Sequence, residues 1–428
     1  RVLCGHVHRP VVTGWGGTLR AYRPQRDYLK LISLGDRRAV ADKWQLPLRG
    51  RWLWRLKDKI DRDFMDKFAR YPEMTRPAVP PHAVQGLGEA IGDKPMCGGC
   101  GGRLGADQLA GALRALPAPR RADIVTARGD DAAVLRSGGG FQVITTDHLR
   151  SFGLDPALMA RIAAIHALGD VWAMGAAPQA ALAQITLPPA AAPIAAQMLA
   201  EIMAAATAVM TRAGADMVGG HTAFGDALSI GFTVTGLCAR PILKSGAQLG
   251  DALILTKPLG SGVIMAAEMA LGRADGLILG EVVARALTHM QRDQGAAAAI
   301  LAPHAHAISD VTGFGLAGHL LEMLDGAHLG AHIRADAIPL MQGALALAQA
   351  GYGSGLLPSN IAAHAGRVDG AAVSLGDMLH DPQTAGGLLA AVPAHMAGSL
   401  LAALHAGGDD DAAIIGHITA GAVRIKLI

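Results

Sequence analysis

The 428-residue sequence is poor in aromatic residues, in charge and in cysteine. Aromatic side chains make up 4% of it and charged ones 17%, whereas 51% is hydrophobic. This composition excludes a disordered, collagenous or coiled-coil protein. Four cysteines are too few for a disulfide scaffold, and no signal peptide is visible, so the sequence predicts a cytoplasmic protein. The first residue is Arg1 and not Met, which indicates a fragment or a processed product.

Charge is divided unevenly along the chain. Residues 1–82 hold 18 of the 38 Lys and Arg but only 8 of the 35 Asp and Glu, so they carry +10 and the remainder carries −7. Prolines interrupt residues 71–85, which indicates a linker. The expected domains are therefore 1–82, with the linker reaching about 86, then 87–240 and 241–428.

The basic segment contains one predicted helix, over Trp52–Tyr71. It either packs on its own domain or lies as a basic amphipathic helix on a membrane surface or on a partner. No arginine-rich or aromatic-interleaved motif accompanies the charge, so no nucleic-acid partner is predicted. The apolar residues that define the helix recur at helical spacing: Leu53, Leu56, Ile60, Phe64 and Phe68.

From about residue 87 the pattern is α/β. Residues 171–200 carry no formal charge, but Pro and Gln interrupt them, which excludes a membrane span and predicts a buried strand and an alanine-rich helix. The expected strands are Ala132–Leu135, Val143–Thr146, Ala180–Leu187, Leu228–Leu237 and Leu253–Thr256, and the expected helices are Leu158–Met174 and Ala191–Ala213.

Aspartates recur at the expected ends of these elements, several of them beside glycines. A single Asp in a turn usually has a local structural role, but several such turns favour a carboxylate cluster. Mg²⁺ prefers carboxylate oxygens and takes phosphates as further ligands. Since no Walker-type loop is present, ATP would be bound mainly through metal and backbone N–H groups. The aspartates are Asp130, Asp131, Asp147, Asp170 (one helical turn after His166), Asp310 and Asp381.

Two glycine-containing motifs leave alternatives open. Gly219-Gly220-His221, expected as a turn before a strand, is either a simple turn or a close approach to a ligand. Cys97-Gly-Gly-Cys100 has no second pair, so a structural zinc site is not predicted. The segment is either a flexible linker or a glycine loop that carries a reactive cysteine.

These motifs, in order, resemble the selenide, water dikinase (selenophosphate synthetase) family. The match runs from Cys97 to about Leu389. It comprises CGGCGGRLG (97–105), DDAAV (130–134), TTD (145–147), HALGDVWAMG (166–175), GGH (219–221), LTKPLGSG (255–262), DVTGFGLAGH (310–319) and DPQTAGGLL (381–389).

The resemblance implies the two-domain α/β (α+β) fold of the aminoimidazole-ribonucleotide synthetase superfamily, whose N-terminal half pairs into a dimer barrel. It implies synthesis of selenophosphate from selenide, ATP and water, with release of AMP and phosphate. The implied cofactors are Mg²⁺ and also K⁺. By position, the implied Mg²⁺ ligands are Asp131, Asp170 and Asp310. The implied ATP contacts are Arg128, Gly129, Asp130, Asp147 and Asp170, with Gly219, Gly220 and His221 supplied by the partner subunit.

The catalytic positions depart from the family in one place. Cys100 matches the catalytic cysteine or selenocysteine, but Arg103 stands where the family has a lysine. Arginine keeps the charge and still binds phosphate, yet it does not readily lose a proton. An impaired, ATP-binding regulatory module of an attached oxidoreductase is therefore one alternative. Another ATP-using member of the superfamily is a second.

The basic segment resembles the C-terminal end of a flavin-dependent pyridine-nucleotide oxidoreductase. The resemblance rests on Tyr22-Arg-Pro-Gln, Leu31-Ile-Ser-Leu-Gly-Asp-Arg-Arg-Ala-Val and Trp52–Phe68. Residues 1–82 contain no Gly-x-Gly-x-x-Gly fingerprint. FAD would therefore be bound only if the missing upstream domain were present.

Overall fold

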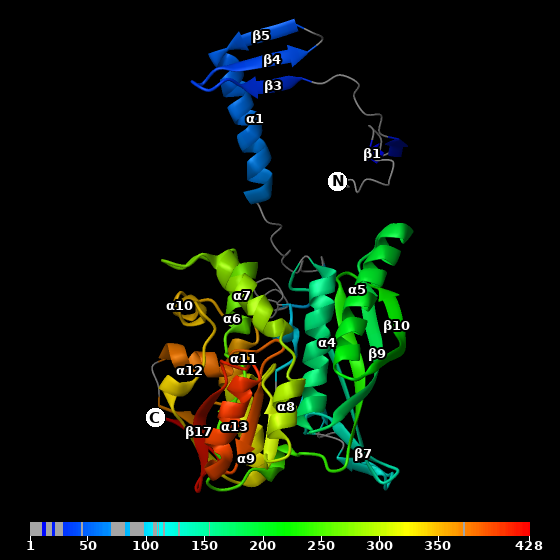
Figure 1. Ribbon diagram of the computed structural model, residues 1–428, viewed down its shortest axis with the longest axis vertical. Helices are drawn as coiled ribbons and strands as arrows, with labels where there is room; N and C mark the ends of the chain where they lie inside the picture. The colour runs from blue at the N-terminus through cyan, green and yellow to red at the C-terminus, as the bar shows by residue number, and fades with distance from the viewer. Residues whose placement is uncertain are drawn as a thin grey trace. The chain divides into compact units, whose positions relative to one another are not determined.

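The computed structural model describes residues 11–13, 19–21, 29–43, 46–69, 82–85, 98–105, 109, 111–113, 116–126, 129–153, 155–370 and 373–428. The chain divides into two compact units between Glu73 and Met74 (Figure 1). The division falls inside the proline-rich stretch of residues 71–85.

The first unit combines small antiparallel sheets with one helix. Helix α1, Arg51–Ala69, confirms the predicted helix, and Leu53 packs it against Ala39 and Ala41 of the sheet. The strands are β1 (Val11–Thr13) paired with β2 (Leu19–Ala21), and β3 (Lys30–Ser33), β4 (Ala39–Lys43) and β5 (Leu46–Gly50) paired in that order. The exposed side of the helix carries large apolar residues at four-residue spacing: Trp52, Leu56 and Ile60.

The second unit begins with a six-stranded sheet of order β10-β9-β11-β8-β7-β6. All neighbouring strands are antiparallel except β9 and β10. Side chains of β9 alternate between the core and the opposite face, as a half-covered sheet requires. The bounds are β6 Ile124–Thr126, β7 Ala133–Ser137, β8 Gly140–Arg150, β9 Ala177–Leu187, β10 Asp216–Phe224 and β11 Ser229–Cys238.

Helices α4 (Pro156–Ala173) and α5 (Ala192–Arg212) cover one face of this sheet (Figure 1). Asp155 begins α4 by accepting the main-chain N–H groups of Ala157 and Leu158, and Pro156 occupies the first helical position. Helix α4 is buried on nearly all sides because it also contacts β13 and α7 of the C-terminal half. It therefore forms the shared core of the two halves.

Helix α5 is long and apolar enough to cross a membrane by length and composition alone. In the structure it packs against α4 and β10, and 22% of its most apolar window is buried. The sequence excluded a span over residues 171–200 and predicted a strand and a helix instead. Both elements are observed, as β9 and α5.

One expectation about a strand end is wrong, and one of the two alternatives for Gly219–His221 is excluded. Asp147 does not end its strand: β8 continues to Arg150 because it pairs with β11 without interruption from Phe141 onward. Gly219, Gly220 and His221 do not form a turn but lie within β10, after an irregularity at Met217. A Cβ atom on Gly220 would lie 2.1 Å from the carbonyl oxygen of Ala183, so this pairing requires glycine there.

The opposite face of the sheet carries hydrogen-bonded polar side chains from three strands. Gln184 donates to Thr233 at 2.6 Å, and Thr233 donates to Thr146 at 3.1 Å. Leu182 and Leu237 are exposed nearby, at 42% and 43%. Helices α4 and α5, which pack on the sheet, lie on its other face (Figure 1).

The C-terminal half is built around a seven-stranded sheet of order β13-β16-β12-β17-β14-β18-β15. Its central strands are buried on both faces, which explains their continuous apolar runs. The strands are β12 Ala252–Leu255, β13 Ala307–Asp310, β14 Gly330–Ile333, β15 Val368–Asp369, β16 Leu388–Val392, β17 Ala413–Thr419 and β18 Ile425–Leu427. The helices are α6 Ser261–Met269, α7 Leu279–Gln291, α8 Gly295–Leu301, α9 Gly315–Ala327, α10 Ala344–Gln349, α11 Leu357–Ala363, α12 Val373–His380 and α13 Ala394–Ala406.

The loop before β16, Asp381–Gly387, caps the N-terminus of α6 from a distant part of the sequence. The Gln383 side-chain oxygen accepts the N–H groups of Gly260 and Ser261, and the Asp381 carboxylate accepts that of Val263 at 2.8 Å. These bonds satisfy donors that a helix leaves unpaired at its first turn. The loop is thereby fixed to the core.

We expect the Asp381 carboxyl to make the free energy of unfolding depend on pH. Burial raises its pKa to about 7, despite its hydrogen bonds from Val263 and Gln383. Because the pKa is raised, the native state holds this proton more tightly than the unfolded chain does. The contribution of this group to the free energy of unfolding is therefore largest at low pH and is lost as pH rises through 7. We expect wild-type protein to lose roughly 2 kcal/mol from this group between pH 5 and pH 8, and Asp381→Asn to remove that loss.

Thermal melting at the two pH values measures this effect. Asp275→Asn, which changes an exposed carboxyl, is the control. An unchanged pH dependence in Asp381→Asn would show that the carboxyl does not titrate in this range.

Candidate active site

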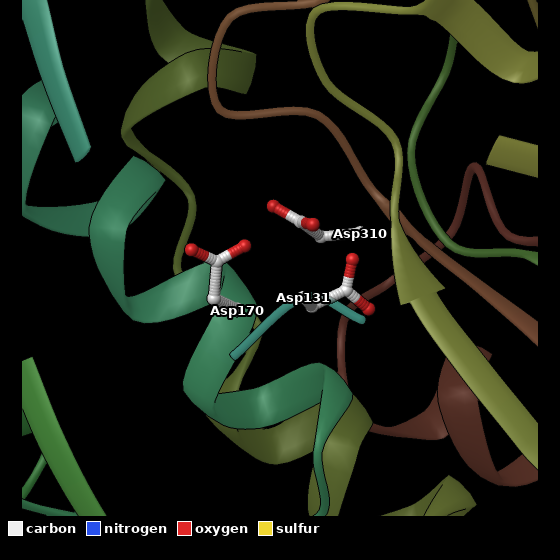
Figure 2. A group of neighbouring side chains, drawn as sticks. All are labelled: Asp131, Asp170 and Asp310. Atoms are coloured by element: carbon white, nitrogen blue, oxygen red, sulfur yellow. The ribbon is translucent and has the colours of Figure 1, made fainter. Parts of the chain in front are cut away.

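Three carboxylates meet at the junction of the two halves. Asp131 lies in a bend before β7, Asp170 in α4, and Asp310 at the end of β13. One carboxylate oxygen from each lies within 4.8 Å of the others. Figure 2 shows the three side chains converging from these elements. The structure therefore brings together the three residues that the sequence predicts as metal ligands.

Neighbouring groups satisfy only part of this cluster. Oδ1 of Asp131 is 2.7 Å from Nζ of Lys244 and accepts from the Ser309 hydroxyl at 3.2 Å. Thr145 donates to Asp170. Oδ2 of Asp131 and Oδ1 of Asp310 are buried without a hydrogen-bond partner. Buried carboxylate oxygens without donors are unfavourable unless a cation lies beside them, so the residues present fit a hard divalent ion.

The electrostatics agree with this fit. Burial raises the pKa of Asp170 well above its ordinary value, and repulsion from Asp310 adds to the rise. Burial likewise raises the pKa of Asp131, although Lys244 opposes it. The Lys244 ammonium is also 2.8 Å from Glu322. Burial alone would raise the pKa of Glu322, but Lys244 and His319 together outweigh it and lower the pKa to about 2. One buried lysine thus offsets part of the negative charge of the site.

A second group adjoins the cluster: Arg103, Asp147 and His166. The Arg103 guanidinium donates to both oxygens of Asp147. Nε2 of His166 is 2.8 Å from Oδ2 of Asp147. Burial alone would raise the pKa of Asp147, but the adjoining imidazole and guanidinium outweigh it and hold the pKa below its usual range. Asp147 therefore stays ionised beside a largely buried arginine.

The glycine segment before Arg103 packs between the two halves. Its main chain forms a short 3₁₀ turn at Cys100–Gly102, and Gly99 donates to the carbonyl oxygen of Arg150 at 2.9 Å. A Cβ atom on Gly98 would lie 2.4 Å from the carbonyl oxygen of Ser151, so the close approach requires glycine. The side chain of Cys100, and all of Cys97, lie outside the described residues.

The remaining predicted ligand contacts lie in different places. Asp130 is next to the cluster, where its Oδ2 accepts the Lys244 N–H at 3.4 Å, and Gly129 precedes it with a φ of 89°. Arg128 lies outside the described residues. Gly219–His221 are not brought to the cluster within one chain, because strands β9 and β11 lie between β10 and β8.

Sequence reasoning missed several polar residues of the site. They are Lys244, Glu322, Ser309 and Thr145, together with the contact of His166 to Asp147. Thr145 and His166 lie inside matched motifs and Ser309 directly precedes one, but Lys244 and Glu322 lie outside them and reach the site only through the fold.

Comparison with known proteins identifies the family. Residues 129–238 match the N-terminal domain, and residues 248–427 the C-terminal domain, of AIR synthase related proteins. The chain is 37% identical to the selenide, water dikinase of Myxococcus xanthus over 344 residues, which cover 78% of this chain and 95% of that relative. It is 38% identical to the Pelobacter propionicus enzyme of the same name over 329 residues, which cover 75% and 92%. The chain belongs to the selenide, water dikinase family.

Solved structures show the same fold at lower identity. The protein tt0281 from Thermus thermophilus aligns with a TM-score of 0.57 and 20% identity over 76% of this chain and 98% of its own. A chain of the HypE–HypF complex aligns with a TM-score of 0.56 and 17% identity over 76% and 96%. The predicted two-domain fold of the dikinase family is therefore confirmed.

Proposed function

We propose that the chain synthesises selenophosphate from selenide, ATP and water, releasing AMP and phosphate. The observation that carries this is the carboxylate cluster, with its buried unpaired oxygens, beside Arg103 in a member of the dikinase family. Phosphoryl transfer needs positioning and charge compensation more than covalent chemistry from the protein. In this site the carboxylates would position a metal ion, and Arg103 would compensate negative charge.

Asp131, Asp170 and Asp310 would hold Mg²⁺, which supplies charge neutralisation to a bound polyphosphate. Lys244 keeps Asp131 turned toward its neighbours through the 2.7 Å ion pair. The Arg103 side chain, 30% exposed, presents positive charge near the cluster. Since it is anchored to Asp147, it needs little reorganisation to stabilise a transferring phosphoryl group.

Other roles remain predictions. The resemblance supports Arg128, Gly129, Asp130 and Asp147 as ATP contacts, Cys100 as the catalytic cysteine, and K⁺ as a further cation. The origin of residues 1–82 in an oxidoreductase, with FAD bound only in a longer chain, is a proposal of the same kind. The domains 1–82, 87–240 and 241–428 are also proposed on this basis.

A homodimer fits the geometry of the N-terminal sheet. Its polar face, around Gln184 and Thr233, is open in one chain, while Leu182 and Leu237 are exposed on the same sheet. A second copy would cover this face as a barrel and would supply Gly219, Gly220 and His221 to the site. In the first unit, the exposed stripe of α1 supports peripheral contact with an anionic membrane.

The reaction is tested by ³¹P NMR of the purified chain with ATP, Mg²⁺ and selenide. We expect a selenophosphate signal together with AMP and phosphate, all dependent on selenide. AMP formation that does not need selenide would favour another ATP-using member of the superfamily. ATP binding without turnover would favour the regulatory alternative, which the close dikinase relatives do not support.

A further inference from the structure

His166 is buried in α4 on the side that faces the C-terminal half. Its side chain is fully buried, although it lies one turn from a proposed metal ligand. Its two ring nitrogens contact different halves of the fold. Nε2 is 2.8 Å from the Asp147 carboxylate of β8, and Nδ1 is 3.3 Å from the main-chain nitrogen of Ala385.

These two partners determine the tautomer. The Ala385 N–H can only donate, so Nδ1 must accept and carry no proton. The ionised Asp147 can only accept, so Nε2 must carry the proton and donate. The structure therefore assigns the neutral Nε2–H form to His166. Arg103, 3.2 Å from Nε2, lies close because both groups donate to the same carboxylate.

Ala385 is itself held in an uncommon conformation. Its φ is +50°, which a residue with a Cβ rarely adopts unless its surroundings enforce it. Its carbonyl oxygen accepts from Nζ of the buried Lys257 at 3.0 Å, while its N–H donates to His166. The loop to which it belongs also caps α6, and the adjacent Thr384 lies against Gly99 of the glycine segment.

We infer that His166 is a positioning residue, which fixes the Asp147 carboxylate that holds Arg103 and ties this pair to the Ala385 main chain of the other half. The inference rests on the proposed function, because it assigns a task to the arginine that would act on the phosphoryl group. The His148 main-chain N–H already donates to Oδ1 of Asp147 at 2.9 Å. His166 adds a donor at Oδ2 and, through its contact with Ala385, ties the carboxylate to the other half of the fold.

Three variants test the inference. His166→Ala removes both hydrogen bonds, whereas His166→Gln keeps a side-chain N–H at about the reach of Nε2. We expect His166→Ala to lower kcat for selenophosphate formation by about tenfold to 100-fold, as misplacement of a catalytic group does, and His166→Gln to restore most of it. His306→Gln, which alters another histidine–carboxylate pair at Asp251, is the matched control and should be unaffected.

A double-mutant cycle separates positioning from general stability. If His166 acts through Arg103, then His166→Ala should cause no further loss in an Arg103→Ala background. A loss of equal size in both backgrounds would overturn the inference, as would a His166→Gln variant as defective as His166→Ala. Melting temperatures of all variants show whether folding contributes.

The tautomer is measurable without turnover. In ¹⁵N-histidine spectra near pH 7, the imidazole signal that disappears in His166→Gln should be that of a neutral ring protonated at Nε2. A protonated or Nδ1–H ring would overturn the inference. Wild-type protein that forms no selenophosphate would contradict the proposed function alone and would leave this spectrum to decide the placement of His166.

Discussion

Asp310→Asn is expected to lower Mg²⁺-dependent selenophosphate formation by about 100-fold or more. The substitution keeps the size of the side chain but removes the charge of a carboxylate that is 3% exposed and has one buried oxygen without a partner. A divalent cation loses one of three convergent charged ligands. Loss of groups that only support a metal ligand already changes affinity or activity by about 10–100-fold.

The measurement is ATP turnover with selenide over a range of Mg²⁺ concentrations, together with direct binding of Mn²⁺ as a spectroscopic probe. We expect weaker cation binding with the fold retained, because the same change also relieves the repulsion that Asp170 feels from Asp310. Asp336→Asn, at an exposed carboxyl, is the control. Unchanged cation affinity in Asp310→Asn would refute the assignment of this cluster as the metal site.

Arg103→Ala is expected to reduce kcat by roughly 10²–10³-fold, the loss that follows removal of one preorganised donor to a developing charge. The guanidinium engages both oxygens of Asp147, so its position is defined before substrate binds. Arg120→Ala, which removes an exposed arginine, provides the control. Steady-state turnover and equilibrium binding of a non-hydrolysable ATP analogue separate a loss of chemistry from a loss of affinity.

Arg103→Lys tests whether the site is adapted to arginine or whether arginine impairs catalysis. The donor to both Asp147 oxygens is Nη2. A lysine ammonium is a compact, strongly hydrated point charge that lacks the further donors of the guanidinium. We therefore expect Arg103→Lys to be less active than wild type, since Asp147 and His166 are arranged around a guanidinium. A large rise in activity would instead indicate that arginine impairs this enzyme.

The pattern of aspartates beside glycines predicted a carboxylate cluster, and the resemblance to the dikinase family implied which three aspartates form it. Asp131 lies in a bend before β7, Asp310 is the last residue of β13, and Asp170 follows His166 by one helical turn. The periodicity of α4 and α5 and the apolar runs of β9, β11 and β12 likewise predicted those elements. The sequence predicts a structural feature correctly where that feature depends only on residues of the same helix or strand.

Properties that depend on pairing between elements were not predictable. The extent of β8 past Asp147 is set by its register with β11, and the extended conformation of Gly220 is set by β9. Lys244 reaches Asp131 from a segment 113 residues later, and nothing around it marks a functional site. The role of Ala385 depends on a backbone conformation that its residue type disfavours.

The division of the proposed metal ligands between the halves has a thermodynamic consequence. Asp131 and Asp170 belong to the first half and Asp310 to the second, while Lys244 joins Asp131 to Glu322 across the same junction. A cation bound there acts as a reversible cross-link, so its binding free energy is also free energy of association between the halves. Free Mg²⁺ would then raise the free energy of unfolding of the packed halves, even before ATP is bound.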